Sequence, residues 1–353
     1  MTEHGTGRRG QHRRAAPTMK HVAALAGVSV MTVSRALATP DRVSPEALEK
    51  VRRAVLQTGY VPDRNAGALS SQRSHIVALT LPTLANGNFA DLAEGISDIL
   101  LPAGYQPLIG HSGHSLEKEE ELVRIMLARR PDAFVLVGTT HSRETSRLLH
   151  ASGITVIETW EYTDNPVDLC VGFSNRRAGE LAAEHLAGLG HRQLAAIGGS
   201  LDDTLKDYRG EQRLRGFRDA ARRLGLPDPV ILREAVVPIR HGQGAGTMAR
   251  LLDDHPGASA VFAISDTMAF GAMMECQRRG IAVPRQLSIL GFGDFDIAGQ
   301  CLPGLSTISV DPVAMGRMIG DRILERMAGS APRSEETAPR IVLRHSTSAP
   351  PGA

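Results

Sequence analysis

The residues whose chemistry stands out lie within one short stretch near the N-terminus. The side chains concerned are Ser29, Val30, Met31, Thr32, Ser34 and Arg35. The three hydroxyl groups can hydrogen-bond to phosphates, and a helix N-terminus at this point would add backbone N–H donors. The guanidinium can bind O6 and N7 of guanine through two hydrogen bonds, whereas the valine and methionine can meet thymine methyl groups or read shape. Such a combination is typical of a surface that contacts double-stranded DNA.

Two short helices with a turn between them would hold these side chains. Thr18 and Ser29 stand where helices are capped, and Gly27 stands where the first helix ends. The apolar residues expected to face inward from this pair are Val22, Leu25, Ala26, Val33 and Leu37. A third helix is expected to begin at Ser44-Pro45-Glu46 and to end at Gly59. Residues 18–58 therefore predict a three-helix head that contains a helix-turn-helix.

Charge is distributed unevenly along the 353 residues. Residues 1–73 hold 12 Lys and Arg against 5 Asp and Glu, and the remainder holds 28 against 33. A basic N-terminal fifth on an acidic body indicates that only the N-terminal part meets a polyanion. Residues 1–17 lack apolar periodicity and are expected to be a disordered basic arm, either inconsequential or a non-specific phosphate contact.

From Ile76 onward, apolar runs alternate with amphipathic stretches. The expected strands are Ile76–Leu81, Pro107–Ile109, Ala133–Val137, Thr155–Glu158, Leu169–Gly172, Leu194–Gly198, Ile231–Val236, Ala260–Ile264 and Leu287–Gly291. Continuous apolar strands separated by helices indicate parallel sheets that are buried on both faces. This number of strands predicts two doubly wound α/β lobes, with a ligand cleft where the strand ends converge.

Several classes of protein are disfavoured by composition. No apolar run approaches the roughly 18 residues of a membrane span, and the Arg-rich N-terminus lacks the apolar core of a secretory signal. Cys170, Cys276 and Cys301 are far apart, which is typical of thiols in a reducing compartment. We therefore expect a cytoplasmic protein with no membrane partner, no metal and no cofactor.

The head carries a long, specific motif. It reads Val22-Ala-x-x-Ala26-Gly-Val-Ser29-x-x-Thr32-Val-Ser-Arg35, followed by Val43-Ser44 and Gly59-Tyr60-Val61-Pro62. This pattern closely resembles the LacI family of repressors, and the resemblance covers essentially the whole chain. It implies that Val30, Met31 and Arg35 read the major groove. His21 stands where the family usually has Asp, which bears on the polarity of the first helix.

Residues 64–73 follow the head. By composition they are a polar linker, but the resemblance implies a hinge that becomes helical on operator DNA. Two such hinges, one from each protomer, would enter the minor groove with Leu69 as a wedge between base steps. Arg64 is expected among the DNA contacts, and Gly67 lowers the intrinsic helix propensity.

For the body, residues 74–345, the resemblance implies a periplasmic-binding-protein-like fold with a ligand between its lobes. The expected ligand contacts are Asn86, Phe89, Trp160, Ser174, Asn175, Arg213, Ser265, Asp266, Asp294 and Asp296. Alternatives remain for three of them. Arg213 could be a surface arginine, Asp266 a helix cap, and Trp160 a core residue instead of a sugar-stacking platform.

The family motif Gly-Phe/Tyr-Asp-Asp/Asn reads Gly291-Phe292-Gly293-Asp294 here, so the usual first Asp is missing. With Val156–Trp160 and Val171–Asn175, this variant resembles the gluconate-utilisation branch of the family. That resemblance implies an open-chain sugar acid such as gluconate, whose carboxylate would suit the guanidinium of Arg213.

The resulting expectation is a homodimeric repressor on a palindromic operator, controlled by a sugar or sugar-acid effector. The tail, residues 346–353, is expected to be disordered. An enzyme is disfavoured because Gly242-Gln-Gly244-Ala-Gly246 lacks the third glycine of a dinucleotide loop, and His111 with His114 is a weak metal pattern. A sugar-binding module without DNA function remains the alternative, separated by a gel shift on palindromic DNA.

Overall fold

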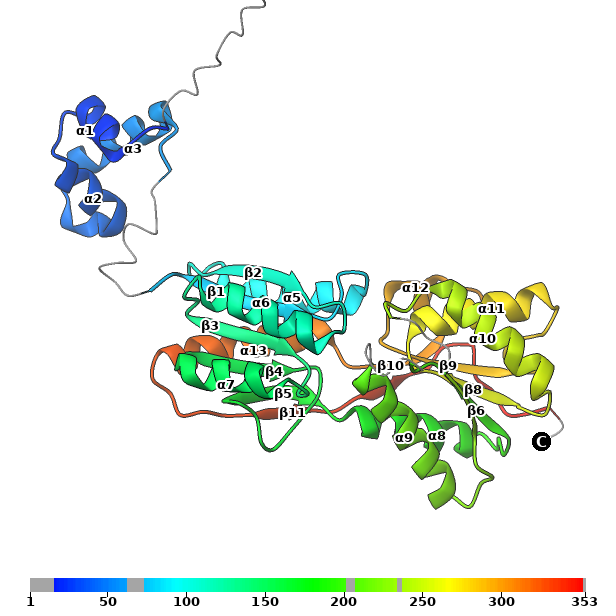
Figure 1. Cartoon of the computed structure of the whole chain (residues 1–353). Coiled ribbons are helices and arrows are strands. Elements are labelled where there is room, and N and C mark those ends of the chain that lie inside the picture. The colour runs from blue at the N-terminus through cyan, green and yellow to red at the C-terminus, as the bar shows by residue number, and fades with distance from the viewer. Residues whose placement is uncertain (1–15, 62–72, 201–206, 234–236, 352–353) are drawn as a thin grey trace, which may run out of the picture. The chain divides into compact units, whose positions relative to one another are not determined.

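The computed structural model describes residues 16–61, 73–200, 207–233 and 237–351 (Figure 1). The chain divides into two compact units at the Arg73–Ser74 bond. Within the first unit we keep the name head for the described residues 16–61, and we call residues from Ser74 the body. The hinge residues expected to touch DNA, Arg64 and Leu69, lie outside the described ranges, as does the basic arm up to residue 15.

The head is a helical unit built around its own apolar core. Its elements are α1 (Met19–Ala26), α2 (Val30–Ala38), the 3-10 turn η1 (Pro40–Arg42) and α3 (Pro45–Thr58). Gly27 ends α1 in the left-handed conformation at φ 65°, and Gly59 ends α3 in the same way at φ 64°. The fully covered core consists of Val22, Ala23, Ala26, Val33, Ala36, Val51, Ala54 and Tyr60.

Two details of the head differ from or add to the sequence expectations. Leu25 is 53 % exposed, so its predicted inward orientation is wrong, and Ala23 occupies the inner face of α1 instead. His21 accepts a hydrogen bond at Nδ1 from the backbone N–H of Thr18 (3.2 Å). The imidazole thus satisfies a backbone donor at the start of α1, which is the task that an acidic or amide side chain usually performs at this position.

The body contains two α/β lobes. The N lobe has the strand order β11-β5-β4-β3-β1-β2, and the C lobe has the order β12-β10-β9-β8-β6-β7. The N-lobe strands are β1 (Ile76–Leu81), β2 (Gln106–His111), β3 (Ala133–Val137), β4 (Thr155–Thr159), β5 (Leu169–Phe173) and β11 (Glu335–Thr337). The C-lobe strands are β6 (Leu194–Ile197), β7 (Val230–Leu232), β8 (Ala260–Ala263), β9 (Ser288–Phe292), β10 (Ser306–Ser309) and β12 (Arg340–Val342).

Pairing within both sheets is parallel apart from β12, which runs antiparallel to β10. The predicted pair of doubly wound lobes is therefore confirmed. The sequence analysis did not identify β10, β11 and β12, which are short and partly polar. The expected strand at Ile231–Val236 is only in part a strand, because β7 ends at Leu232 and residues 234–236 lie outside the described ranges.

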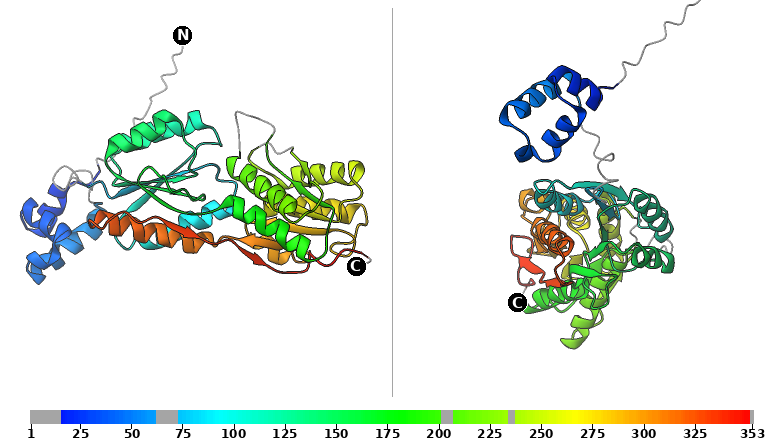
Figure 2. Two further views of the ribbon diagram at one scale, coloured as in Figure 1. Left: turned by 90° about the horizontal axis from the view of Figure 1, so that it is seen from below. Right: turned by 90° about the vertical axis from the view of Figure 1, so that its left-hand side faces the viewer.

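Helices cover both faces of each sheet (Figures 1 and 2). In the N lobe, α5 (Gly87–Leu100) and α13 (Pro312–Met327) pack together on one face, and α6 (Leu116–Leu127) and α7 (Arg143–Ser152) cover the other. The C lobe carries α8 (Asn175–Gly188), α9 (Tyr208–Arg223), α10 (His241–Asp254), α11 (Asp266–Arg278) and the short α12 (Asp296–Gln300).

Alternate residues of the N-lobe strands pack against the two helical layers. Ala78, Phe134 and Leu136 belong to the cluster that includes Val123 of α6 and Leu149 of α7. Their neighbours Val77 and Val135 belong instead to the cluster that includes α5 and α13. Because side chains alternate across a strand, a continuous apolar run buries both of its faces.

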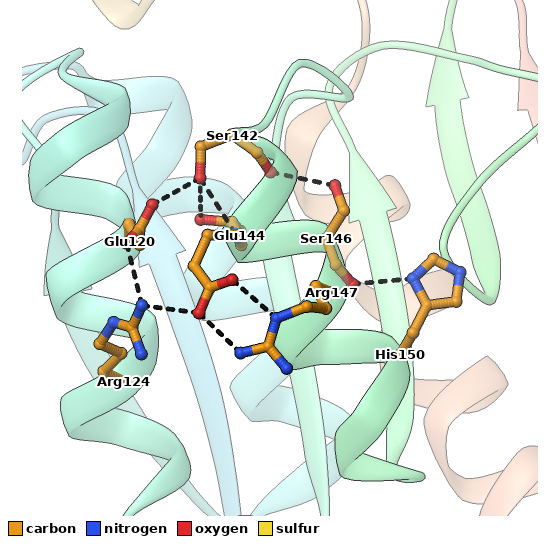
Figure 3. Close-up of polar contacts among 8 residues, drawn as sticks. Glu120, Arg124, Ser142, Glu144, Ser146, Arg147 and His150 are labelled. Atoms are coloured by element: carbon orange, nitrogen blue, oxygen red, sulfur yellow. Dashed lines mark hydrogen bonds and ion pairs between the residues drawn. The ribbon is translucent and has the colours of Figure 1, made fainter.

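Polar side chains fix the outer helices α6 and α7 to one another (Figure 3). Arg124 donates to Glu120 (3.1 Å) and to Glu144 (2.7 Å), and Glu144 also accepts from Arg147. Ser142 caps α7 and donates to Glu120 (2.8 Å). These exposed pairs orient the helix ends more than they add stability, since surface ion pairs contribute little.

The chain passes between the lobes from β5 to α8, from β10 to α13, and from β11 to β12. These passages place Ser174 and Asn175 on one connection and Asp311 on another. Both lobes contribute to one contiguous apolar core.

Glycines allow the most extensively packed helix pairs to approach backbone to backbone. In the pair α8 and α9, a Cβ at Gly179 would collide with the carbonyl of Arg213, and one at Gly216 with the carbonyl of Arg176. The same reciprocal arrangement holds α10 against α11 through Gly244 and Gly271, so the glycine-rich stretch 242–246 lies inside a packed helix.

The expected disorder of residues 346–353 is wrong for the part that the structure describes. Ser346 is fully buried, its hydroxyl donates to the carbonyl of Ile289, and it accepts from the N–H of Ser306 (2.8 Å). Ser348 donates its N–H to the hydroxyl of Ser288 (3.0 Å). The tail is polar because it pairs with polar groups at the starts of β9 and β10, not because it is solvated.

In the described part of the chain, no single helix is long and apolar enough to cross a membrane; α1 and α2 together, bent by 103°, meet the criteria of length and composition.

Candidate functional site

The head presents the outer face of α2. Val33 and Ala36 point into the core, which leaves Val30 41 % and Met31 61 % exposed, with Arg35 also exposed. The structure thus places Val30, Met31 and Arg35, the residues expected to read the major groove, on one accessible helix.

The hydroxyls at the start of α2 have a local role. The Ser29 hydroxyl accepts from the N–H of Thr32 (3.0 Å) and lies 2.8 Å from the Thr32 hydroxyl. Ser29 is therefore the N-cap, and Thr32 shares its hydrogen bond. Ser34 is half-buried beside them. The backbone N–H groups of the first turn that are not used within the helix can still donate hydrogen bonds to a phosphate.

The body contains a pocket between its lobes that is partly open to solvent. The residues lining it from the N lobe are Thr83, Ala85, Asn86, Asn88, Phe89, His114 and Trp160. Those lining it from the C lobe are Asp207, Arg209, Arg213, Pro238, Ile239, Ser265, Thr267, Phe292 and Phe295. Of the expected ligand residues, the structure brings Asn86, Phe89, Trp160, Arg213 and Ser265 together here.

Arg213 is the most constrained side chain of the pocket. It is only 5 % exposed, its guanidinium carbon lies 4.1 Å from the centre of the Phe292 ring, and its Nη1 donates to Asn175 Oδ1. Asn175 in turn donates from Nδ2 to the carbonyl of Trp160 (2.9 Å). Asn175 thus lies behind the pocket and orients two residues that line it.

The described lining of the pocket contains two guanidinium groups and one carboxylate, and the carboxylate of Glu161 also attracts Arg213. Asp207 Oδ2 lies 3.8 Å from Arg213 Nη2, and its Oδ1 lies 4.0 Å from Arg209 Nε. One carboxylate therefore faces two guanidinium groups. Nε of Arg213 has no hydrogen-bond partner among the residues that the structure describes. A buried cation without full compensation is costly.

Burial acts on the protonation of these groups. It lowers the pKa of Arg213 to about 10, although Asp207 opposes the change. Burial alone would raise the pKa of Asp207, but attraction from Arg213 and Arg209 lowers it below its usual value. Burial and the nearby Arg209 lower the pKa of His114 to about 4. At neutral pH the imidazole is uncharged, and the positive charge of the pocket comes from the arginines.

The lobes contact each other at the rim of the pocket. Asn88 of α5 donates from Nδ2 to the carbonyl of Gly293 (2.9 Å). Gly293 has φ 123°, and a Cβ at this position would lie 2.9 Å from the Asn88 amide nitrogen. The residue that replaces the usual Asp of the family motif therefore makes room for an interlobe hydrogen bond.

The remaining expected ligand residues do not line the pocket. Ser174 caps α8 by accepting from the N–H of Arg177 (3.1 Å). Asp294 pairs with Arg344 (2.7 Å), and Asp296 is exposed in the first turn of α12. Asp266 is considered separately below.

Asp266 is completely buried and bridges two segments of the C lobe. Its carboxylate accepts from the Thr307 hydroxyl (2.6 Å) and from the N–H of Phe295 (2.8 Å). Burial raises its pKa to about 6 despite these hydrogen bonds. The cap of α11 is Ser265, which accepts from the N–H of Met268 (3.3 Å), so Asp266 supports the pocket wall from behind.

Sequence reasoning missed Asp207, Arg209 and His114 as pocket residues. A usable signal existed for Arg209, because a residue four positions before Arg213 on a helix faces the same side. His114 was considered only for metal binding. Within the described residues, no group of three His, Cys, Asp or Glu side chains is arranged to hold a metal ion.

Comparison with known proteins adds independent observations. Residues 18–63 match the model for bacterial regulatory proteins of the lacI family, and residues 183–347 match a periplasmic binding protein-like domain. The chain is 39 % identical to the HTH-type transcriptional regulator GntR of Pseudomonas aeruginosa, over 90 % of this chain and 91 % of that protein. This chain belongs to the LacI family.

Solved structures of the family share the fold. A LacI family transcriptional regulator from Silicibacter pomeroyi is 29 % identical with a TM-score of 0.84, covering 94 % of this chain and 99 % of that one. A lac repressor dimer bound to operator is 24 % identical with a TM-score of 0.82 over 94 % of this chain and 99 % of the other. As a member of the LacI family, this protein is a DNA-binding transcriptional repressor and not an enzyme.

Proposed function

We propose that this repressor binds a palindromic operator as a homodimer and that a sugar acid such as gluconate, bound between the lobes, controls its affinity for DNA. The observation that carries the effector class is the pair of guanidinium groups in the pocket wall. Among the described residues that line the pocket, Arg209 and Arg213 face one carboxylate, that of Asp207, so this lining has a net positive charge, although Glu161 also attracts Arg213. A carboxylate ligand would supply the missing negative charge and accept several N–H donors.

The rest of the pocket suits a polyol chain. Amide and hydroxyl side chains from both lobes line it, including Asn86, Asn88, Ser265 and Thr267. Trp160 and Phe89 supply an apolar wall. Hydroxyl groups on an open-chain sugar acid would pair with the former, and its C–H faces would pack against the aromatic rings. The relative named GntR is consistent with this class of ligand.

Control of DNA binding follows from linkage. A ligand that contacts both lobes binds one arrangement of the lobes more tightly than the other. It can therefore change the affinity for DNA only to the extent that the two arrangements differ in that affinity. In a symmetric dimer, each body would thereby set the spacing of the two recognition helices and hinges, with Arg64 and Leu69 of each hinge at the minor groove. A sugar-binding module without DNA function is disfavoured because residues 18–63 match the family's DNA-binding domain.

The test is fluorescence anisotropy with the full chain on DNA that the protein itself selects from a random library. We expect the selected sequence to be an inverted repeat bound by two chains. We also expect D-gluconate to change the dissociation constant at least about fivefold, a typical allosteric coupling, whereas the uncharged D-glucitol leaves it nearly unchanged. Arg213→Ala should abolish the response and retain DNA binding. No response to gluconate or to any other sugar acid would refute the effector class.

A further inference from the structure

Arg209 connects the two lobes through the wall of the pocket. It lies on α9 of the C lobe, yet its Nη1 donates to the carbonyl of Val137 (3.2 Å), the last residue of β3 in the N lobe. The residue is 9 % exposed and lines the pocket. One buried guanidinium therefore touches both lobes and the space between them.

The N lobe is shaped to admit this side chain. Gly138 follows Val137 with φ 112°, a conformation that disfavours other residues. A Cβ at this position would lie 2.8 Å from Arg209 Nη1. The glycine thus provides both the turn and the free space into which the guanidinium extends.

Among the residues that the structure describes, Arg209 has few partners for a buried cation. Its described contacts are the Val137 carbonyl and the Asp207 carboxylate at 4.0 Å, which also faces Arg213 at 3.8 Å. A guanidinium offers five N–H donors, so several remain for a ligand. His114 lines the same pocket but is uncharged at neutral pH, because burial and the charge of Arg209 lower its pKa to about 4.

We propose that Arg209 makes the site select anionic over neutral effectors and couples the bound anion to closure of the lobes. This inference rests on the proposed function, in which an effector binds between the lobes. The hydrogen bond to the Val137 carbonyl forms only when the lobes are together, and it then holds the guanidinium of Arg209 in place for the anion. The anion therefore has a higher affinity for the closed arrangement, as coupling requires.

The first experiment separates charge selection from a structural role. The full chain carries a single tryptophan, Trp160, in the pocket wall, so its fluorescence can follow titrations with D-gluconate and with D-glucitol. We expect Arg209→Gln to weaken gluconate binding by about tenfold or more, as for loss of a charged hydrogen bond, with glucitol binding little changed. Arg209→Lys should keep part of the preference. Arg215→Gln, an exposed arginine on the same helix, is the control and should behave like wild type.

Equal losses for the charged and the neutral ligand in Arg209→Gln would overturn the proposal, because a merely structural residue would produce that result. Thermal unfolding and binding to the selected DNA confirm that each variant is folded. We also expect the ratio of gluconate affinity to glucitol affinity to fall in the order wild type, Arg209→Lys, Arg209→Gln.

The second experiment measures closure without depending on the effector's identity. Spin labels on cysteines introduced at Ile125 in the N lobe and Leu224 in the C lobe report the interlobe distance. Both positions are exposed, whereas Cys170, Cys276 and Cys301 are buried, so labelling is selective. We expect a broader distance distribution in ligand-free Arg209→Gln than in wild type. Identical distributions would overturn the coupling to closure even if gluconate binds, whereas failure of gluconate to bind wild type would count against the proposed function instead.

Discussion

Asn175 joins Trp160 to Arg213 through one buried amide. Its Nδ2 donates to the Trp160 carbonyl at 2.9 Å, and its Oδ1 accepts from the Arg213 guanidinium. Trp160 is held at φ 67°, a strained conformation for a residue with a side chain, and its ring packs edge-on against Phe89 and Phe173. The passage from β5 to α8 thereby fixes a pocket residue from each lobe. Asn175 is adjacent to Ser174, which caps α8, so single substitutions can test the two roles separately.

Replacing Asn175 should therefore impair effector binding more than replacing its neighbour. Asn175→Ala leaves a buried guanidinium N–H and a buried carbonyl unpaired, which costs about 2 kcal/mol in the free energy of unfolding. Ser174→Ala removes only a helix cap, at about 1 kcal/mol. We expect Trp160 fluorescence titrations to show weakened effector binding in Asn175→Ala and nearly normal binding in Ser174→Ala. Equal affinities in the two variants would show that Asn175 does not orient the pocket.

Arg35 should carry most of the hydrogen-bonded base discrimination of the head. Its neighbours on the exposed face of α2, Val30 and Met31, have no donor to offer a base edge. We expect Arg35→Ala to lose about 1–3 kcal/mol of preference for operator over scrambled DNA, while most non-specific binding and its salt dependence remain. Anisotropy on both DNAs at several salt concentrations measures this. Arg52→Ala, an exposed arginine on α3, serves as the control, and normal discrimination by Arg35→Ala would refute the assigned recognition face.

Two glycines of α10 should respond oppositely to alanine. A Cβ at Gly244 would collide with the backbone carbonyl of Met268 in α11, whereas one at Gly246 meets nothing within 4 Å. We expect Gly244→Ala to lower the free energy of unfolding by about 2 kcal/mol or more through overpacking. Gly246→Ala should raise it by about 0.5–1 kcal/mol, because it only improves helix propensity. Urea unfolding of both variants provides the measurement, and similar shifts would show that the α10–α11 contact is not close-packed.

How far the sequence predicts this structure depends on which interactions specify each part. Ala133–Val137 was recognised as a strand because a parallel strand buried on both faces is a continuous apolar run. Glu335–Thr337 and Arg340–Val342 were not, because these edge strands carry polar and charged residues and owe their conformation to their neighbours.

The residues of the pocket likewise divide into those that a local sequence pattern predicts and those that only distant contacts specify. Arg213 was expected from a family motif, and the structure buries it in the pocket wall. The function of Asp266 could not be read locally, since its partners Thr307 and Phe295 lie 41 and 29 residues away. Arg209 reaches Val137, 72 residues earlier, only through the juxtaposition of two lobes. Local patterns specify elements, whereas contacts between distant segments decide which polar residues face the ligand.

His141 should make stability depend on pH on the alkaline side of neutrality. Its side chain is 2 % exposed, with Nδ1 at 2.7 Å from Glu119 and Nε2 at 3.2 Å from Glu158. Burial alone would lower the pKa of His141, but the hydrogen bond to Glu119 and the attraction from Glu119 and Glu158 raise it to about 9 from 6.5. The folded state therefore retains a proton that the unfolded state loses between these values. The resulting stabilisation is fully present below pH 6.5 and is lost as the pH rises through 9.

We expect the free energy of unfolding to fall by up to roughly 3 kcal/mol over this interval, since each pKa unit corresponds to about 1.4 kcal/mol. His141→Gln should be less stable at pH 6.5 and should show a flatter dependence, because its side chain does not titrate. His150→Gln is the matched control: His150 is exposed on α7 and its Nδ1 contacts only the Ser146 carbonyl (2.8 Å) among the contacts drawn in Figure 3. Urea unfolding between pH 6 and 10 gives the curves, and parallel slopes for wild type and His141→Gln would show that the imidazole is not held in its charged form by Glu119 and Glu158.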